Sequence, residues 1–211
     1  MARGGAYYKA KERIEEALQS GTTELNLSFM NLTDLPETLG RLTQLELLDL
    51  SNNQLTTLPE WLGQLTQLQS LNLSYNRLTT LPESLSQLKQ LYSLNLYHNQ
   101  LIALPRALDH LLQLQSLDLS TNQLSTIPEY MSHLKQLQIL HLSNNQFRDL
   151  PLPLAQLVLS GDFLIEHDDF LPRGNYYRTN LELFYEEDEL NEEEEDDDDE
   201  HFQVIKPSKH S

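Results

Sequence analysis

The sequence predicts an α/β solenoid, a curved stack of short coils that each add one strand to a parallel sheet. Three columns of residues recur every 23 positions and carry this prediction. They are a proline preceded by Leu or Ile, an asparagine, and a Leu-x-Leu pair shortly before that asparagine. Their members are Pro36, Pro59, Pro82, Pro105, Pro128 and Pro151; Asn53, Asn76, Asn99, Asn122 and Asn145; and Leu48/Leu50, Leu71/Leu73, Leu94/Leu96, Leu117/Leu119 and Leu140/Leu142.

Each coil has two halves with different patterns. The Leu-x-Leu half predicts a short strand whose leucines point into the core, while the residues between them line the concave side. The half after the proline, as in Leu62, Leu65 and Leu68, has apolar residues at three-residue spacing. This spacing predicts a 3₁₀ turn or short helix on the convex side. Proline suits its start because its φ is preset and no ladder hydrogen bond is lost.

The asparagine column is predicted to be structural. An Asn amide offers two donor hydrogens and an acceptor oxygen, enough to bond buried backbone groups at the turn after its strand and in the next coil. In the first coil Met30 takes this position. We therefore expect that coil to lack the contact, and the neighbouring N-terminal segment to be the reason.

Residues 1–20 predict an N-terminal helix that caps the stack. Apolar residues form one stripe at helical spacing, and Gly21 follows as a stop signal. The first coil needs this stripe to cover its open apolar end, which disfavours the alternative of a helix that binds a membrane surface or a partner. The stripe consists of Tyr7, Ala10, Ile14, Ala17 and Leu18.

The repeats are predicted to occupy residues 21–160 as about six coils. A degenerate last coil and a C-terminal cap follow at 161–185, with Asp168 at the asparagine position. Residues 186–211 form an acidic tail, which we expect to be disordered because its charges repel one another and cannot build a core. The cap is expected to bury its large residues, which are Phe170, Tyr176, Tyr177, Leu181 and Phe184.

The repeat Leu-x-x-Leu-x-Leu-x-x-Asn-x-Leu-x-x-Leu-Pro-x-x-Leu-x-x-Leu resembles the 23-residue class of intracellular leucine-rich-repeat proteins. Plant Ras-group and bacterial, especially cyanobacterial, members read in a similar way. Residues 13–17 and 21–28 are similar to the start of many bacterial members. The resemblance covers about residues 7–160 and implies a horseshoe with a parallel concave sheet. It does not select a function, because the family's members bind many unrelated partners.

Composition limits the classes of function. The chain has no Cys, which excludes disulfides, thiolate zinc sites and a cysteine nucleophile. It shows neither a secretory signal nor an apolar run of membrane-spanning length, so we expect a cytoplasmic protein without membrane contact. The net charge is −18, and residues 182–200 alone hold 14 acidic side chains. Because negative charge repels phosphates, basic proteins are expected partners and nucleic acid is not.

The sequence does not predict an enzyme. Asp118 and His141 should lie on adjacent strands, with Ser116, Ser120 and Ser143 nearby, but an open sheet offers no enclosed pocket or oxyanion hole. His98 lies two coils from His141, which is too far for shared zinc coordination. The chain also lacks a glycine-rich phosphate loop and the common hydrolase and metalloprotease motifs. No catalytic residue, cofactor or metal is therefore expected.

The predicted function is a non-catalytic protein–protein interaction module or scaffold, acting as a monomer. Its concave face should carry large side chains of the types that anchor interfaces, with the partner across coils two to five. The centre would be Tyr75, Tyr97 and His98. The remaining residues predicted for this face are Phe29, Asp49, Asn72, Arg77, Asn95, Asp118 and His141.

Two alternatives remain at this point. The family's repeat could simply tolerate these side chains, which would leave the concave surface partly idle. The acidic tail could instead bind basic proteins, because a leucine-rich domain followed by such a tail resembles the acidic leucine-rich nuclear phosphoproteins, which engage histones. That comparison implies a histone-binding or chaperone-like role.

Overall fold

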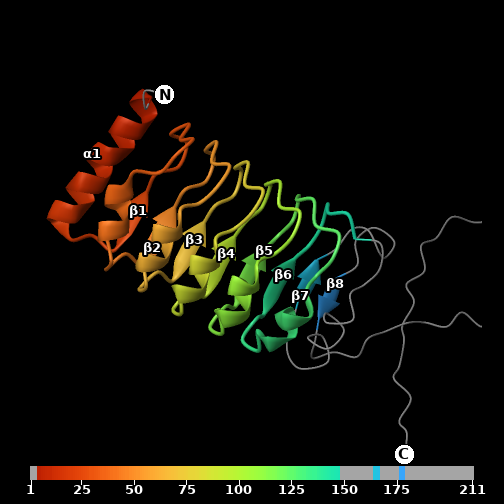
Figure 1. The fold of residues 1–211 in the computed structure, drawn as a ribbon. Coiled ribbons are helices and arrows are strands. Elements are labelled where there is room, and N and C mark those ends of the chain that lie inside the picture. Colours follow the sequence, from red (N-terminus) through yellow and green to blue (C-terminus); the bar gives the residue numbers. More distant parts are fainter. Residues whose placement is uncertain (1–3, 148–163, 167–175, 179–211) are drawn as a thin grey trace, which may run out of the picture.

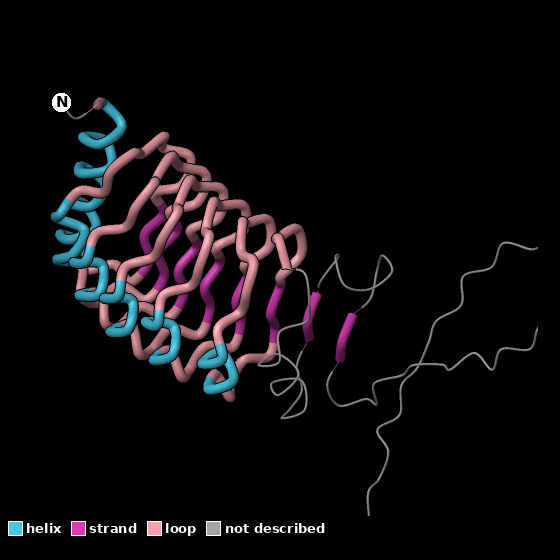
Figure 2. The backbone as a smooth tube through the Cα atoms, turned by 45° about the vertical axis from the view of Figure 1, so that its right-hand side comes forward, coloured by secondary structure: helices cyan, strands magenta, loops and turns pink. Residues whose placement is uncertain are grey.

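The computed structural model describes residues 4–147, 164–166 and 176–178. They form a solenoid with one helix at its N-terminal end (Figure 1). Helix α1 spans Gly5–Ser20, and an eight-stranded sheet follows with its strands in sequence order. Figure 2 shows these strands in one row and the short helices in another. The strands are β1 (Glu24–Asn26), β2 (Leu47–Asp49), β3 (Ser70–Asn72), β4 (Ser93–Asn95), β5 (Ser116–Asp118), β6 (Ile139–His141), β7 (Leu164–Glu166) and β8 (Tyr176–Arg178).

The repeat period sets the register of the sheet. From β1 to β6 each strand residue pairs with the residue 23 positions later, as Leu48 does with Leu71, and β6 continues in parallel onto β7. Both leucines of each pair are buried, although each strand ends before the second one. The predicted parallel sheet is thus confirmed. Strand β8 pairs antiparallel with β7, which the sequence did not predict.

Several expectations concern residues that the structure does not describe. Asp168, Phe170, Leu181, Phe184 and the acidic tail lie outside the described residues. Tyr176 and Tyr177 lie in β8, where only the backbone is described.

Helix α1 covers the open end of the first coil, which confirms the helical N-terminal cap. Ala10 and Ile14 are fully buried in the core that runs on through the repeats. Gly21 ends the helix in the left-handed region at φ 64°, and its N–H donates to the carbonyl of Ala17 at 3.0 Å. No helix in the described residues is long and apolar enough to cross a membrane.

Within residues 4–147, five 3₁₀ helices form the convex side, as predicted. Each begins directly after a repeat proline whose carbonyl accepts the first hydrogen bond, as Pro59 does from the Leu62 N–H at 3.1 Å. Neighbouring turns pack closely: a Cβ on Gly63 would lie 2.6 Å from the Ser84 carbonyl oxygen, so only glycine fits there. The helices are η1 (Glu37–Arg41), η2 (Glu60–Gln64), η3 (Glu83–Gln87), η4 (Arg106–His110) and η5 (Glu129–His133).

The asparagine side chains form a ladder that links successive coils. In Asn76, Nδ2 donates to the carbonyls of Leu50 and Leu73 at 2.9 and 3.1 Å, while Oδ1 accepts from the Leu55 N–H at 3.1 Å. Two of these groups belong to the preceding coil, so the expectation that each asparagine serves the next coil was wrong. The same pattern recurs in Asn53, Asn99, Asn122 and Asn145.

Met30 at the ladder position of the first coil follows from this direction. The first coil has no preceding coil to serve, because α1 packs there, and so it needs no asparagine. Its own turn is nevertheless bonded, since the N–H groups of Met30 and Leu32 donate to Asn53 Oδ1 at 3.2 and 2.9 Å. The contact that an asparagine at position 30 would make is therefore absent, as expected, while the turn of the first coil is bonded by Asn53 of the second.

Replacing one ladder asparagine should destabilise the whole stack. We expect Asn99→Ala to lower the free energy of unfolding by about 2 kcal/mol, because it leaves the buried Leu78 N–H without a partner, a loss worth about 1–3 kcal/mol, while the Leu73 carbonyl keeps its bond from Asn76. Urea unfolding followed by circular dichroism measures this loss. Gln100→Ala, next to it on the exposed surface, is the control and should change stability by less than about 0.5 kcal/mol. Equal effects of the two changes would contradict a structural ladder.

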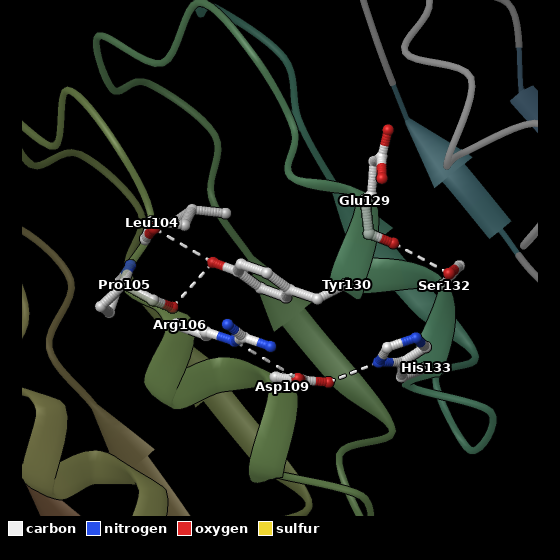
Figure 3. A network of polar contacts seen from close by, with 8 residues as sticks. All are labelled: Leu104, Pro105, Arg106, Asp109, Glu129, Tyr130, Ser132 and His133. Atoms are coloured by element: carbon white, nitrogen blue, oxygen red, sulfur yellow. Dashed lines mark hydrogen bonds and ion pairs between the residues drawn. The ribbon is translucent and has the colours of Figure 1, made fainter.

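A polar network ties η4 to η5 on the convex side (Figure 3). The Tyr130 hydroxyl reaches the carbonyls of Leu104 and Pro105 at 3.0 and 2.7 Å. The Asp109 carboxylate contacts His133 Nδ1 at 2.6 Å and Arg106 Nε at 4.0 Å. Burial, with smaller contributions from Glu83 and Asp109, raises the pKa of Tyr130 to about 12. The folded state therefore favours the neutral phenol.

This pKa makes a testable contribution to alkaline stability. Because the folded pKa lies above the ordinary value of 10, the contribution is complete below pH 10 and is lost as the pH rises toward 12. Tyr130→Phe removes it and also costs about 1 kcal/mol at neutral pH through the lost hydrogen bond. The difference in unfolding free energy between the two proteins should thus shrink between pH 10 and 12. A difference that stays constant over this range would contradict the assignment.

Candidate functional site

One row of polar side chains crosses the concave face of the sheet. Asp49, Asn72, Asn95 and Asp118 lie side by side in register on β2 to β5, and all are partly exposed. In each, Oδ1 accepts the N–H of the residue two positions later, at 2.8 to 3.1 Å. These predicted binding residues therefore also shape the turn after their strand, a role that the sequence analysis did not assign.

Asp118 and His141 are neighbours in register on β5 and β6, as expected. The Asp118 carboxylate accepts from the Ser120 backbone N–H at 2.9 Å, and the Ser143 hydroxyl donates to that of Ser120 at 3.4 Å. Ser120 itself is 6% exposed. In the part of the chain that the structure describes, no group of three or more His, Cys, Asp or Glu side chains could hold a metal ion.

The structure brings three of the predicted anchor residues into one aromatic cluster, defined as Tyr75, Tyr97 and His98. The rings of Tyr75 and Tyr97 meet edge to face, with centroids 5.1 Å apart at 85°. The His98 ring lies 5.0 Å from that of Tyr75, tilted by 30°, and 5.9 Å from that of Tyr97. Hydrogen bonding to Tyr97 raises the pKa of the Tyr75 hydroxyl. All three side chains retain exposed surface, which is 44% for Tyr75.

One ring of the cluster is present because its residue departs from the repeat. Tyr97 occupies a position at which every other described coil has serine, namely Ser28, Ser51, Ser74, Ser120 and Ser143. A serine at this position is too small to contact the ring of Tyr75. The single Tyr in this column therefore adds a third ring to the pair formed by Tyr75 and His98.

Two further predicted residues lie outside the cluster. Phe29 is 75% exposed and belongs to the first coil, two strand spacings or about 10 Å from the coil of Tyr75. Arg77 is exposed and follows the buried ladder residue Asn76, so it stands at the rim rather than on the sheet face.

The residue directly before each ladder position has a positive φ, a feature that the sequence analysis missed. Values of 53° to 55° recur through the described coils, in a region that strains residues with a Cβ and that asparagine tolerates best. Two coils place asparagine there, but four place Phe, Tyr, His or Thr. The only available signal was the asparagine in those two coils. The column comprises Phe29, Asn52, Tyr75, His98, Thr121 and Asn144.

This backbone strain can be measured at Thr121. We expect Thr121→Asn to raise the free energy of unfolding by about 1 kcal/mol, because a β-branched residue is costly at φ 54°. The reciprocal change Asn52→Thr should lower it by a similar amount at an equivalent backbone site. Chemical denaturation of both variants tests the pair, and shifts of the same sign would refute strain as the cause.

A parallel solenoid with a leucine core, 3₁₀ turns and an asparagine ladder defines a class of repeat protein. The chain belongs to the leucine-rich-repeat family: the family model described as "Leucine rich repeat" matches residues 20–78, 58–101 and 103–147, more than half of the chain. The resemblance to leucine-rich-repeat proteins is thus confirmed, while the 23-residue class stays a prediction. No curated protein matches the chain.

Solved structures agree with this assignment. A Shigella effector leucine-rich-repeat domain is 33% identical, with a TM-score of 0.59 and coverage of 72% of this chain and 63% of that domain. The crystal structure of PEPR1-AtPEP1 is 34% identical, with a TM-score of 0.60 over 69% of this chain and 21% of that chain. The chain therefore spans less than two thirds of either. Leucine-rich repeats are typically non-catalytic binding modules, which supports a binding role.

Proposed function

We propose that this chain is a non-catalytic protein-binding module or scaffold, whose partner docks on the concave face across β2 to β5. The aromatic cluster is the observation that carries the proposal. Tyr is among the residues that most often dominate binding energy, and here two tyrosines and a histidine are already packed together before binding. Less side-chain freedom then has to be lost when a partner arrives.

The backbone of the cluster supports the same function. Tyr75 and His98 both occupy the positive-φ column, where asparagine would be less strained. Strain of about 1–3 kcal/mol at such positions is typical of functional sites. The structure of PEPR1-AtPEP1, whose name gives two components, contains a solenoid similar to this one, which also supports binding. We place the module in the cytoplasm as a monomer, with Phe29, Arg77 and His141 at the margins of its interface.

Replacing the cluster with repeat-matched residues should remove binding without unfolding the chain. Tyr75→Asn and Tyr97→Ser introduce the residues that other coils carry at these positions. The loss of ring contacts and the relief of strain oppose each other, so we expect the melting temperature to stay within about 3 °C. Partner recovery from a lysate, quantified by mass spectrometry, should fall at least tenfold, as expected for hot-spot residues.

The matched control is Tyr92→Ala. Tyr92 is also exposed, but it precedes β4 at the opposite end of the strand from the cluster. This variant should recover the partner as the unchanged chain does. Unchanged recovery with the doubly substituted cluster would refute a binding role for the concave face.

The acidic run supports a second candidate function. With 14 acidic residues and no Lys or Arg between residues 182 and 200, it offers a strong charge for basic, histone-like proteins. A chain that ends after Tyr185 separates the two functions. Loss of salt-sensitive binding to basic proteins would favour the acidic run, whereas binding that needs Tyr75 and Tyr97 but survives this truncation would favour the concave face.

A further inference from the structure

Two carboxylates flank the two central asparagines of the polar row on the concave face. Asp49 on β2 and Asp118 on β5 have two asparagines between them in register, Asn72 and Asn95. Three strand spacings separate the two acids, which corresponds to about 14 Å. Each carboxylate uses Oδ1 in its turn, while Oδ2 accepts no hydrogen bond from the described residues. One oxygen of each acid is therefore available to a ligand.

The surface between the two acids, here called the floor, consists of small neutral side chains. Ser70, Ser93 and Ser116 are neighbours in register on β3 to β5 and lie beside the row of asparagines. Small hydroxyl and amide side chains let a backbone approach closely and can bond its N–H and C=O groups. Tyr75 and Tyr97 follow β3 and β4, so their paired rings lie at the edge of this floor where the strands end.

The charges on this face favour a cation. Glu24 on β1 adds a third carboxylate beside β2. Of the positive side chains near this face, Arg77 follows a buried asparagine at the rim, and Arg13 of α1 donates to the Asn26 carbonyl of β1. An acidic segment that crossed the floor would meet carboxylates at both ends. A basic segment would meet complementary charge at both ends.

We propose that the concave face recognises an extended segment of a partner protein with cationic side chains at positions i and i+4. Alternate residues of an extended chain share a face and rise about 3.3 Å each, so residues i and i+4 lie about 13 Å apart, close to the spacing of Asp49 and Asp118. Residue i+2 then lies over Asn72 and Asn95, beside Tyr75 and Tyr97. An apolar side chain suits that position. This inference rests on the proposed function and adds the chemistry of the partner.

The experiment uses the full chain and two capped nine-residue peptides of identical composition. Both contain glycine and serine with a central leucine, but one carries arginines at positions 3 and 7 and the other at positions 4 and 6. The acidic run meets the same net charge in both, so a difference in affinity reports the spacing. We expect the 3/7 peptide to bind about fivefold more tightly, as an added pair of exposed ionic contacts allows.

Asp49→Asn and Asp118→Asn are matched variants, because asparagine at the equivalent positions of β3 and β4 makes the same turn. Each should weaken the 3/7 peptide about fivefold and abolish the preference for spacing. Titration by nuclear magnetic resonance should move the amide signals of Ser51 and Ser120, whose N–H groups bond these carboxylates.

Three results would overturn the inference. They are equal affinity for the two peptides, affinity for the 3/7 peptide that neither variant changes, and tighter binding of a 3/7 peptide with glutamates in place of its arginines. These failures are distinct from failure of the proposed function. If Tyr75→Asn and Tyr97→Ser still abolish the recovery of a partner, the concave face remains a binding surface. Only the proposed preference for spaced cations is then wrong.

Discussion

The structure depends on one requirement, which is that the backbone groups in the buried turn after each strand find partners. Water cannot reach these groups, and an unpaired buried group costs about 1–3 kcal/mol. The ladder asparagines supply partners from the following coil: Asn76 accepts from the Leu55 N–H, and it shares the Leu50 carbonyl with Asn53. No coil can therefore satisfy its own backbone. Stability is a property of the whole stack, and the concave surface is rigid because the stack is rigid.

The same ladder explains where the surface can vary. The turn that presents each asparagine holds the preceding residue at a positive φ and directs it to the rim. Asn52 and Asn144 accommodate this conformation with little strain, whereas Tyr75 and His98 do not. Tyr97, on the sheet side of the same turn, departs from a column of serines. Tyr75, Tyr97 and His98 thus depart from the repeat at one place on the surface. The residues that build the fold are therefore different from the residues proposed to bind.

The fold was predictable because the same pattern of residues recurs in every coil. The 23-residue period gave the parallel register, and the stripe around Ile14 gave the helical cap. The direction of the asparagine bonds was not predictable, since a strictly periodic sequence reads alike toward either neighbour. The positive φ before each ladder position was not predictable, because no glycine occupies that column. The contact of Asp109 with His133 joins residues outside the repeat pattern, so only the structure reveals it.

The one-way bonding of the ladder gives the stack a polarity. Deleting the first coil would remove the contacts of Asn53 to Leu27 and Leu32, yet every later turn would keep its ladder asparagine. Deleting a coil from the other end would strip the turn before it of the amide on which it relies. Shortening such an array is therefore asymmetric, and an engineered version could be trimmed at its front and recapped more readily than it could be cut at its back.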